Sequence, residues 1–107
     1  MTDAETTALV ERARLSMTLV LIAAAREIEA ARSRDHRYAE AATSIKRIAA
    51  TMGMVSDDVL LKLATANQLS EGLLSTLIAT RLSEVGGALP VYEDAKAFFQ
   101  SLVEQVD

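Results

Sequence analysis

The sequence has no cysteine, and only 4% of its residues are aromatic, although half of them are hydrophobic. Without cysteine the chain cannot form disulfides, thiolate metal sites or a thiol nucleophile. A core poor in aromatic residues must be built from alanine, leucine, isoleucine, valine and methionine, which suit close packing between helices better than a sheet. No segment shows a convincing strand pattern. We therefore expect an all-α protein.

Long hydrophobic runs and targeting signals are also lacking. The apolar run Leu19–Ala25 has seven residues, whereas a membrane-spanning helix needs about 20. The first residues, Met1–Glu5, are acidic and lack the basic region of a signal peptide. We expect a soluble, cytoplasmic protein with no membrane segment, folded as a single domain over residues 1–107.

A long helix is predicted at the beginning of the chain. Residues 6–32 contain neither glycine nor proline, and Asp3 and Glu5 suit a helix that begins near Thr2 or Asp3. A helix of about 28 residues is about 42 Å long, whereas a compact domain of this size is about 34 Å across. Either the molecule is elongated, or a second subunit covers the part of the helix that extends beyond the domain.

Further helices follow the turn at residues 32–37. Ser33 or Asp35 is predicted to cap the second helix, and Gly53 is predicted to end it in a left-handed conformation. Ser56 is a suitable cap for a third helix. Residues 67–72 form either a kink in that helix or a turn into a fourth helix.

The end of the chain carries the clearest stop signal, Gly86-Gly87, followed by Pro90 at a first-turn position of the last helix. Short connections favour antiparallel neighbours. The predicted fold is an antiparallel bundle of four or five helices with a long N-terminal helix.

Two apolar stripes run along the long helix, which predicts two packing partners. The longer stripe is flanked by Leu21 and Ile28 and contains Val10, Ala13, Met17, Val20, Ala24 and Ala31. The shorter stripe contains Leu15, Leu19 and Ile22. We assign the longer stripe to the intrachain core. Leu15, Leu19 and Ile22 are then the predicted interface of a homodimer, because a twofold axis covers the same stripe on both copies.

Charge is unevenly distributed, although the net charge is −4. Residues 26–47 carry six basic and four acidic groups, and residues 48–107 carry three basic and eight acidic groups. The turn groups four candidate partner-binding residues, Arg32, Arg34, His36 and Arg37. They could hold a phosphate or the acidic surface of a protein partner. The simpler interpretation is a solvated turn near a helix C-terminus, where cations are favourable.

Residues 48–59 resemble a helix-turn-helix motif, with Gly53 at the turn. The second helix of such a motif offers basic or amide side chains to the bases of DNA. Here that helix begins with Asp57 and Asp58, whose carboxylates would face phosphates. We therefore expect no nucleic-acid binding, and an ordinary corner between two helices of a bundle is the preferred interpretation.

Catalytic and metal sites are not predicted. His36 is the sole histidine, and no serine, cysteine or second acid is placed by the sequence to complete a site with it and Asp35. Glu27 and Glu29 do not share a helix face, and there is no Glu-x-x-His pair of the kind that binds two metal ions in a bundle. We expect no cofactor.

These observations predict a non-enzymatic protein-interaction module, such as an adaptor, an inhibitor or a chaperone-like protein, that acts as a homodimer. The alternative is a helix-turn-helix regulator that uses the Gly53 turn. A third reading is a carrier of an apolar ligand in the interior of the bundle. The residues do not identify a partner.

Overall fold

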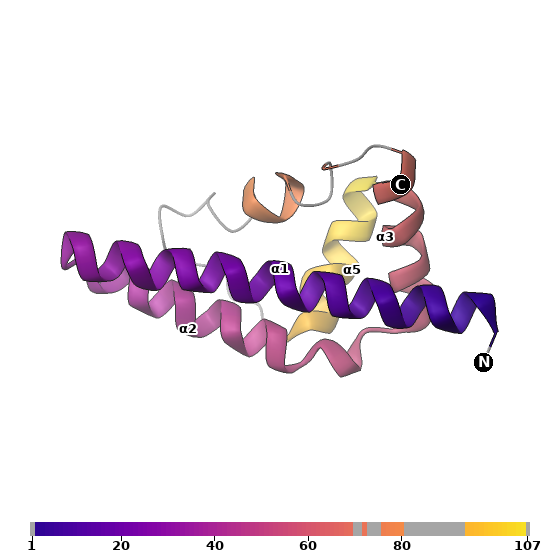
Figure 1. The fold of residues 1–107 in the computed structure, drawn as a ribbon, viewed down its shortest axis with the longest axis horizontal. Helices are drawn as coiled ribbons and strands as arrows, with labels where there is room; N and C mark the ends of the chain where they lie inside the picture. The colour runs from indigo at the N-terminus through magenta and orange to yellow at the C-terminus, as the bar shows by residue number, and fades with distance from the viewer. Residues whose placement is uncertain (1, 70–71, 73–75, 81–93, 107) are drawn as a thin grey trace.

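In a computed structural model, the chain is an all-α helical bundle (Figure 1). The structure describes residues 2–69, 72, 76–80 and 94–106, and 91% of these residues are helical. The predicted all-α class is therefore confirmed. The molecule measures 47 × 23 × 21 Å, and the first helix extends along its longest dimension (Figure 1).

Helix α1 (Asp3–Ser33) begins where the sequence predicts. Thr2 and Glu5 form a capping box, in which the Thr2 hydroxyl accepts a hydrogen bond from the Glu5 N–H at 3.1 Å. The helix ends at Arg34, whose φ of 59° lies in the left-handed region. At about 1.5 Å per residue, 31 residues extend for about 46 Å, which accounts for the length of the molecule.

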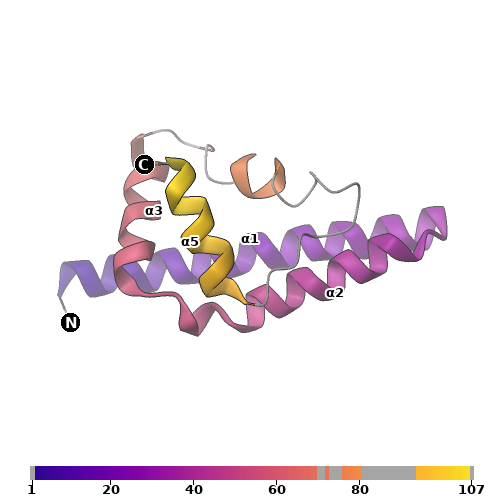
Figure 2. The same ribbon diagram turned by 180° about the vertical axis from the view of Figure 1, so that it is seen from behind.

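Helix α2 (His36–Ala50) runs back along α1 in the opposite direction (Figures 1 and 2). Of the two predicted caps, Asp35 is the one that serves, because its carboxylate accepts a hydrogen bond from the Arg37 N–H at 3.0 Å. The buried residues of α2 are Ala41, Ala42, Ile45 and Ile48. The two helices form an antiparallel hairpin, and their facing sides supply much of the core.

The corner after α2 differs from the prediction for Gly53. Helix α2 is capped at Thr51, and Gly53 lies in the 3₁₀ turn η1 (Met52–Met54) without a positive φ. The predicted left-handed cap at Gly53 is therefore wrong. The chain turns instead by tightening into a 3₁₀ turn, in which the Met54 N–H bonds to the Thr51 carbonyl at 3.0 Å.

Helix α3 (Asp57–Leu69) follows Ser56, whose hydroxyl accepts a hydrogen bond from the Val59 N–H at 3.3 Å. The helix ends before Gly72, which adopts a φ of 82° in a turn, so the segment 67–72 contains a helix end rather than a kink. Residues 76–80 are again helical. The predicted stop at Gly86-Gly87 and the predicted start at Pro90 lie outside the described residues.

Helix α5 (Ala95–Val106) closes the fold, and the Asp94 carboxylate accepts a hydrogen bond from the Ala97 N–H at 2.9 Å at its start. Helices α3 and α5 cross α1 steeply, and both lie on the same side of it as α2 (Figures 1 and 2). Phe98 and Phe99 are fully buried, with ring centroids 5.0 Å apart. They pack in one core with residues from every helix, including Leu19, Ile45, Ile48, Leu60, Leu63, Ile78 and Leu102.

Candidate interaction surface

The shorter apolar stripe of α1, which contains Leu15, Leu19 and Ile22, faces the core of the protein. Leu15 is 2% exposed and Leu19 is 0% exposed, and the partly buried Ile22 packs against the same core. These residues pack in the common core, and α2 and α3 are the helices that contact α1 most extensively. Their assignment to a homodimer interface is therefore wrong, because a second chain cannot reach side chains that this chain already covers.

The longer stripe is the exposed one. Val10 and Ile28 each lie nine residues from Leu19, and nine residues correspond to about 180° around an α-helix. Accordingly, Val10 is 53% exposed and Ile28 is 62% exposed, while Leu19 opposite them is fully buried. The assignment of the longer stripe to the core is therefore also wrong. The shorter stripe lies in the core, and the longer stripe is exposed.

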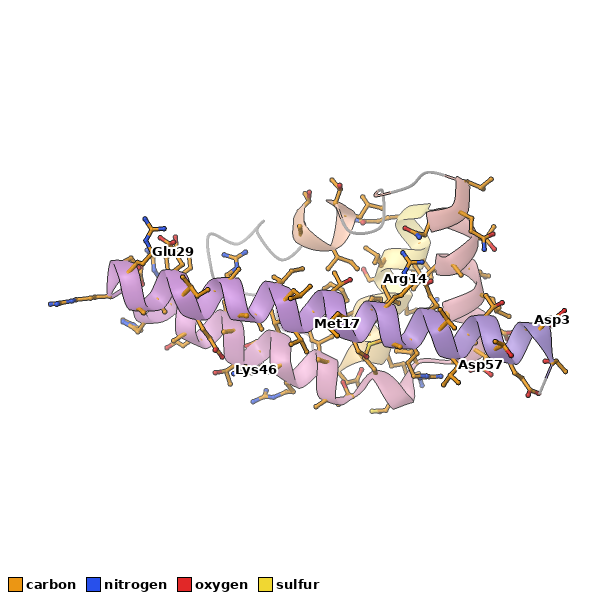
Figure 3. The ribbon with its side chains drawn as sticks, in the orientation of Figure 1. Asp3, Arg14, Met17, Glu29, Lys46 and Asp57 are labelled. Carbon is orange, nitrogen blue, oxygen red and sulfur yellow. The ribbon has the colours of Figure 1, made fainter. Side chains whose placement is uncertain are left out.

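We call this exposed face the outer stripe. It comprises Val10, Ala13, Met17, Val20, Leu21, Ala24, Ile28 and Ala31, all of them exposed. Figure 3 shows Met17 near the middle of α1, between Asp3 at one end and Glu29 toward the other. From Val10 to Ala31 the outer stripe extends for about 31 Å along the helix.

The outer stripe concentrates exposed apolar surface on one element. Among the described residues, eight large hydrophobic side chains are exposed, and six of them belong to α1. Single exposed hydrophobic residues are ordinary in proteins, whereas a contiguous apolar patch marks an interaction site. Sequence reasoning had found the stripe but could not tell which of the two faces the rest of the chain covers.

The four basic residues of the turn between α1 and α2 have different roles. Arg37 forms a bidentate ion pair with Asp35, with an Nη2–Oδ2 distance of 2.7 Å. This ion pair, together with the backbone hydrogen bond from Arg37, lowers the pKa of the Asp35 carboxyl to about 2. Arg37 is therefore committed to the cap of α2 rather than to a ligand.

The other three basic residues of the turn are exposed. Arg32 approaches Glu29 at 3.8 Å, with 76% of its side chain accessible. Arg34 forms the left-handed C-cap of α1, and His36 is the first residue of α2. The structure thus places the four candidates in one turn without directing them toward a common anion site.

The corner at Gly53 is braced by Arg12 of α1. The Arg12 guanidinium donates a hydrogen bond to the Met52 carbonyl, and a second nitrogen lies 3.2 Å from the Asp57 carboxylate. Asp57 and Asp58 form the exposed first turn of α3. A helix that begins with two exposed carboxylates repels DNA phosphates. The corner is therefore better suited to joining two helices of the same chain than to binding DNA.

Glu11 is the one buried charged residue in the described part of the chain, at 2% exposure. Its Oε2 accepts a hydrogen bond from Arg14 at 3.3 Å, whereas its buried Oε1 has no hydrogen-bond partner among the described residues. Burial raises the pKa of Glu11, and the Arg14 charge opposes part of this increase. Sequence reasoning missed Glu11, because a glutamate between Val10 and Arg12 gives no signal of burial.

A shallow hollow of about 230 Å³ lies beside Glu11. It is lined by Thr6, Thr7, Val10, Glu11, Arg14, Ala64 and Gln68. The hollow lies between α1 and α3, and five of its seven lining residues carry polar side chains, which differs from the apolar bundle interior that a lipid-like ligand would require. The hollow therefore does not favour the carrier reading.

Within the described residues, no group of three acidic or histidine side chains is arranged to hold a metal ion. No described helix is both long and apolar enough to cross a membrane. No family model, curated protein or solved structure matches the chain. A functional assignment must therefore rest on the surface of the molecule itself.

Proposed function

We propose that this protein is a non-enzymatic interaction module that binds another protein chain through the outer stripe of α1, and that it self-associates as a homodimer. The observation that carries the proposal is the position of the stripe, on the face of α1 opposite the core. Each leucine or isoleucine removed from water contributes roughly 1.5–3 kcal/mol. A second helix packed on this face would cover the five large apolar side chains of the outer stripe, Val10, Met17, Val20, Leu21 and Ile28, and this burial favours pairing.

A second copy of the chain is the occupant that we favour. An outer stripe that pairs with itself across a twofold axis covers both exposed faces with one contact. Apolar positions in the stripe recur every seven residues, at Val10, Met17, Ala24 and Ala31. This is the spacing of helices that pack along their length as a coiled coil.

The test is sedimentation equilibrium of wild type beside Met17→Asp. Met17 is 60% exposed in the single chain, so the variant is expected to keep its helical circular dichroism while losing the dimer. The matched control is Leu69→Asp, which places the same charge at an exposed leucine of α3 and is expected to leave the dimer intact. A wild-type monomer at tens of micromolar would contradict the homodimer.

The variant Leu19→Asp provides a check on the core. Because Leu19 is fully buried, a charge there is expected to unfold the chain rather than to dissociate a dimer. Retention on heparin separates the proposal from the helix-turn-helix alternative. A DNA-binding protein is retained and elutes in a salt-dependent manner, whereas the interaction module is expected to flow through.

A further inference from the structure

Four of the large side chains in the outer stripe are placed symmetrically about the level of Leu19. Val10 and Ile28 lie nine residues on either side of Leu19, and Met17 and Leu21 lie two residues on either side. In an antiparallel pair of helices, position numbers increase in opposite directions. A twofold axis at the level of Leu19 therefore brings Val10 opposite Ile28 and Met17 opposite Leu21, so that these four large side chains of each copy meet their counterparts in the other.

Opposite charges continue the outer stripe at its two ends. Asp3 lies seven residues before Val10, and Arg32 lies four residues after Ile28. The two are 29 residues apart, which places them within about 20° of each other around the helix. Both side chains are exposed. The stripe thus has an acidic end and a basic end on the same side of α1.

This arrangement of charge distinguishes the two directions of pairing. In a parallel pair with the helices in register, Asp3 would face Asp3 and Arg32 would face Arg32. In the antiparallel register centred at Leu19, Asp3 of one copy lies about 4.5 Å along the helix axis from Arg32 of the other. An arginine side chain can span that offset, so two ion pairs close the two ends of the interface.

We infer that two copies of this protein pair antiparallel along α1, with the twofold axis at Leu19 and with Asp3 of each copy against Arg32 of the other. The inference rests on the proposed self-association and adds its direction and register. The remainder of the fold permits it, because α2, α3 and α5 all lie behind α1 as seen in Figure 1 and in front of it in the reversed view of Figure 2. Within the part of the chain that the structure describes, these three helices leave the outer stripe uncovered along α1.

Cysteine cross-linking tests the register directly, since the chain contains no cysteine of its own. We expect a mixture of Val10→Cys and Ile28→Cys chains to form a disulfide-linked dimer under mild oxidation, and each variant alone to remain uncross-linked. The control mixture of Val10→Cys with Leu69→Cys is expected to remain uncross-linked too, because Leu69 lies on α3, away from the outer stripe.

The outcomes separate this inference from the proposed function. A wild-type monomer overturns both. A dimer in which Val10→Cys cross-links with itself overturns the antiparallel register and leaves self-association standing. A dimer that is disrupted by Met17→Asp, but in which the mixed chains do not cross-link, likewise excludes the register centred at Leu19.

Charge reversal gives a second test with a different readout. Asp3→Arg and Arg32→Asp are each expected to raise the dimer dissociation constant about fivefold at low salt, because each breaks two exposed ion pairs per dimer. The double variant restores opposite charges in the antiparallel dimer and is expected to recover most of the loss. If the double variant is as weak as the two single variants combined, Asp3 and Arg32 do not meet.

Discussion

The side-chain oxygen of Thr51 accepts a hydrogen bond from the backbone N–H of Ala95 at 2.8 Å. Thr51 caps the C-terminus of α2, and Ala95 is the first residue of α5, 44 residues later. The same hydroxyl lies 3.1 Å from the Ile48 carbonyl, to which it donates. One small side chain thus joins the end of one helix to the start of another.

This relationship predicts that Thr51→Val lowers the free energy of unfolding by about 1 kcal/mol, because the Ala95 N–H loses its acceptor. Thr51→Ser keeps the hydroxyl and is expected to retain most of the stability. The control is Thr43→Val, at an exposed threonine that bonds only to the Ala39 carbonyl of its own helix among the interactions described. Urea denaturation measures all three variants, and equal losses at positions 43 and 51 would contradict the role of Thr51.

The two described glycines should respond differently to alanine. Gly72 has a φ of 82°, which a residue with a Cβ tolerates poorly, so Gly72→Ala is expected to cost about 1 kcal/mol. Gly53 has no positive φ, and a Cβ added there would meet nothing within 4 Å. Gly53→Ala is therefore expected to be neutral or slightly stabilising. Thermal unfolding of both variants tests this contrast, and a larger loss at Gly53 would reverse it.

The ends of the helices could be predicted from the sequence where the signal is local. The Thr2–Glu5 capping box and the Asp35 cap each involve residues within three positions of one another, so the sequence alone specifies the interaction. The error at Gly53 has the opposite cause. A glycine near a helix end suggests a left-handed cap, but the corner is tied instead by Arg12, from a distant part of the chain.

The candidate surface could be predicted only in part, for the same reason. Both stripes of α1 are apolar, and the outer stripe is the longer and more regular of the two, which favoured it as the core. The choice between them is made by the rest of the fold, which buries Leu15 and Leu19 in the common core and which no pattern within α1 describes. The inner face also contains Glu11, which makes it look less like a core than it is.

Asp35 should titrate far below an ordinary aspartate. Its pKa is lowered from 3.8 to about 2, chiefly by the side-chain hydrogen bonds from Arg37. Because the pKa is lower in the folded state, the carboxylate stabilises the fold above pH 3.8, and this contribution is lost as the pH falls toward 2. Carboxyl chemical shifts measured by NMR over this range should show it directly. In Arg37→Gln the pKa of Asp35 is expected to move back toward 3.8, and an unchanged value would assign the shift to the helix terminus alone.

The pKa of Glu11 is shifted in the opposite direction from that of Asp35, so its effect on the free energy of unfolding has the opposite dependence on pH. Burial raises its pKa in the folded protein above the ordinary value of 4.5, so the folded state binds the proton more tightly than the unfolded chain does. The stabilising contribution of the proton is present below pH 4.5 and is lost as the pH rises through the folded-state pKa. The fold therefore carries a buried carboxyl group with one oxygen that has no hydrogen-bond partner among the described residues.

Glu11→Gln replaces this ionisable group with a neutral amide while nearly preserving the shape of the side chain. We expect the variant to be more stable than wild type at pH 7, by on the order of 1 kcal/mol, and the difference to shrink as the pH falls toward 4.5. Glu5→Gln, at an exposed glutamate of the same helix, serves as a control for general carboxylate effects. Urea denaturation at a series of pH values and one fixed protein concentration gives the comparison, because the proposed self-association makes stability depend on concentration. If Glu11→Gln is instead less stable at pH 7 and the gap widens with pH, the attraction between Glu11 and Arg14 outweighs the cost of burial.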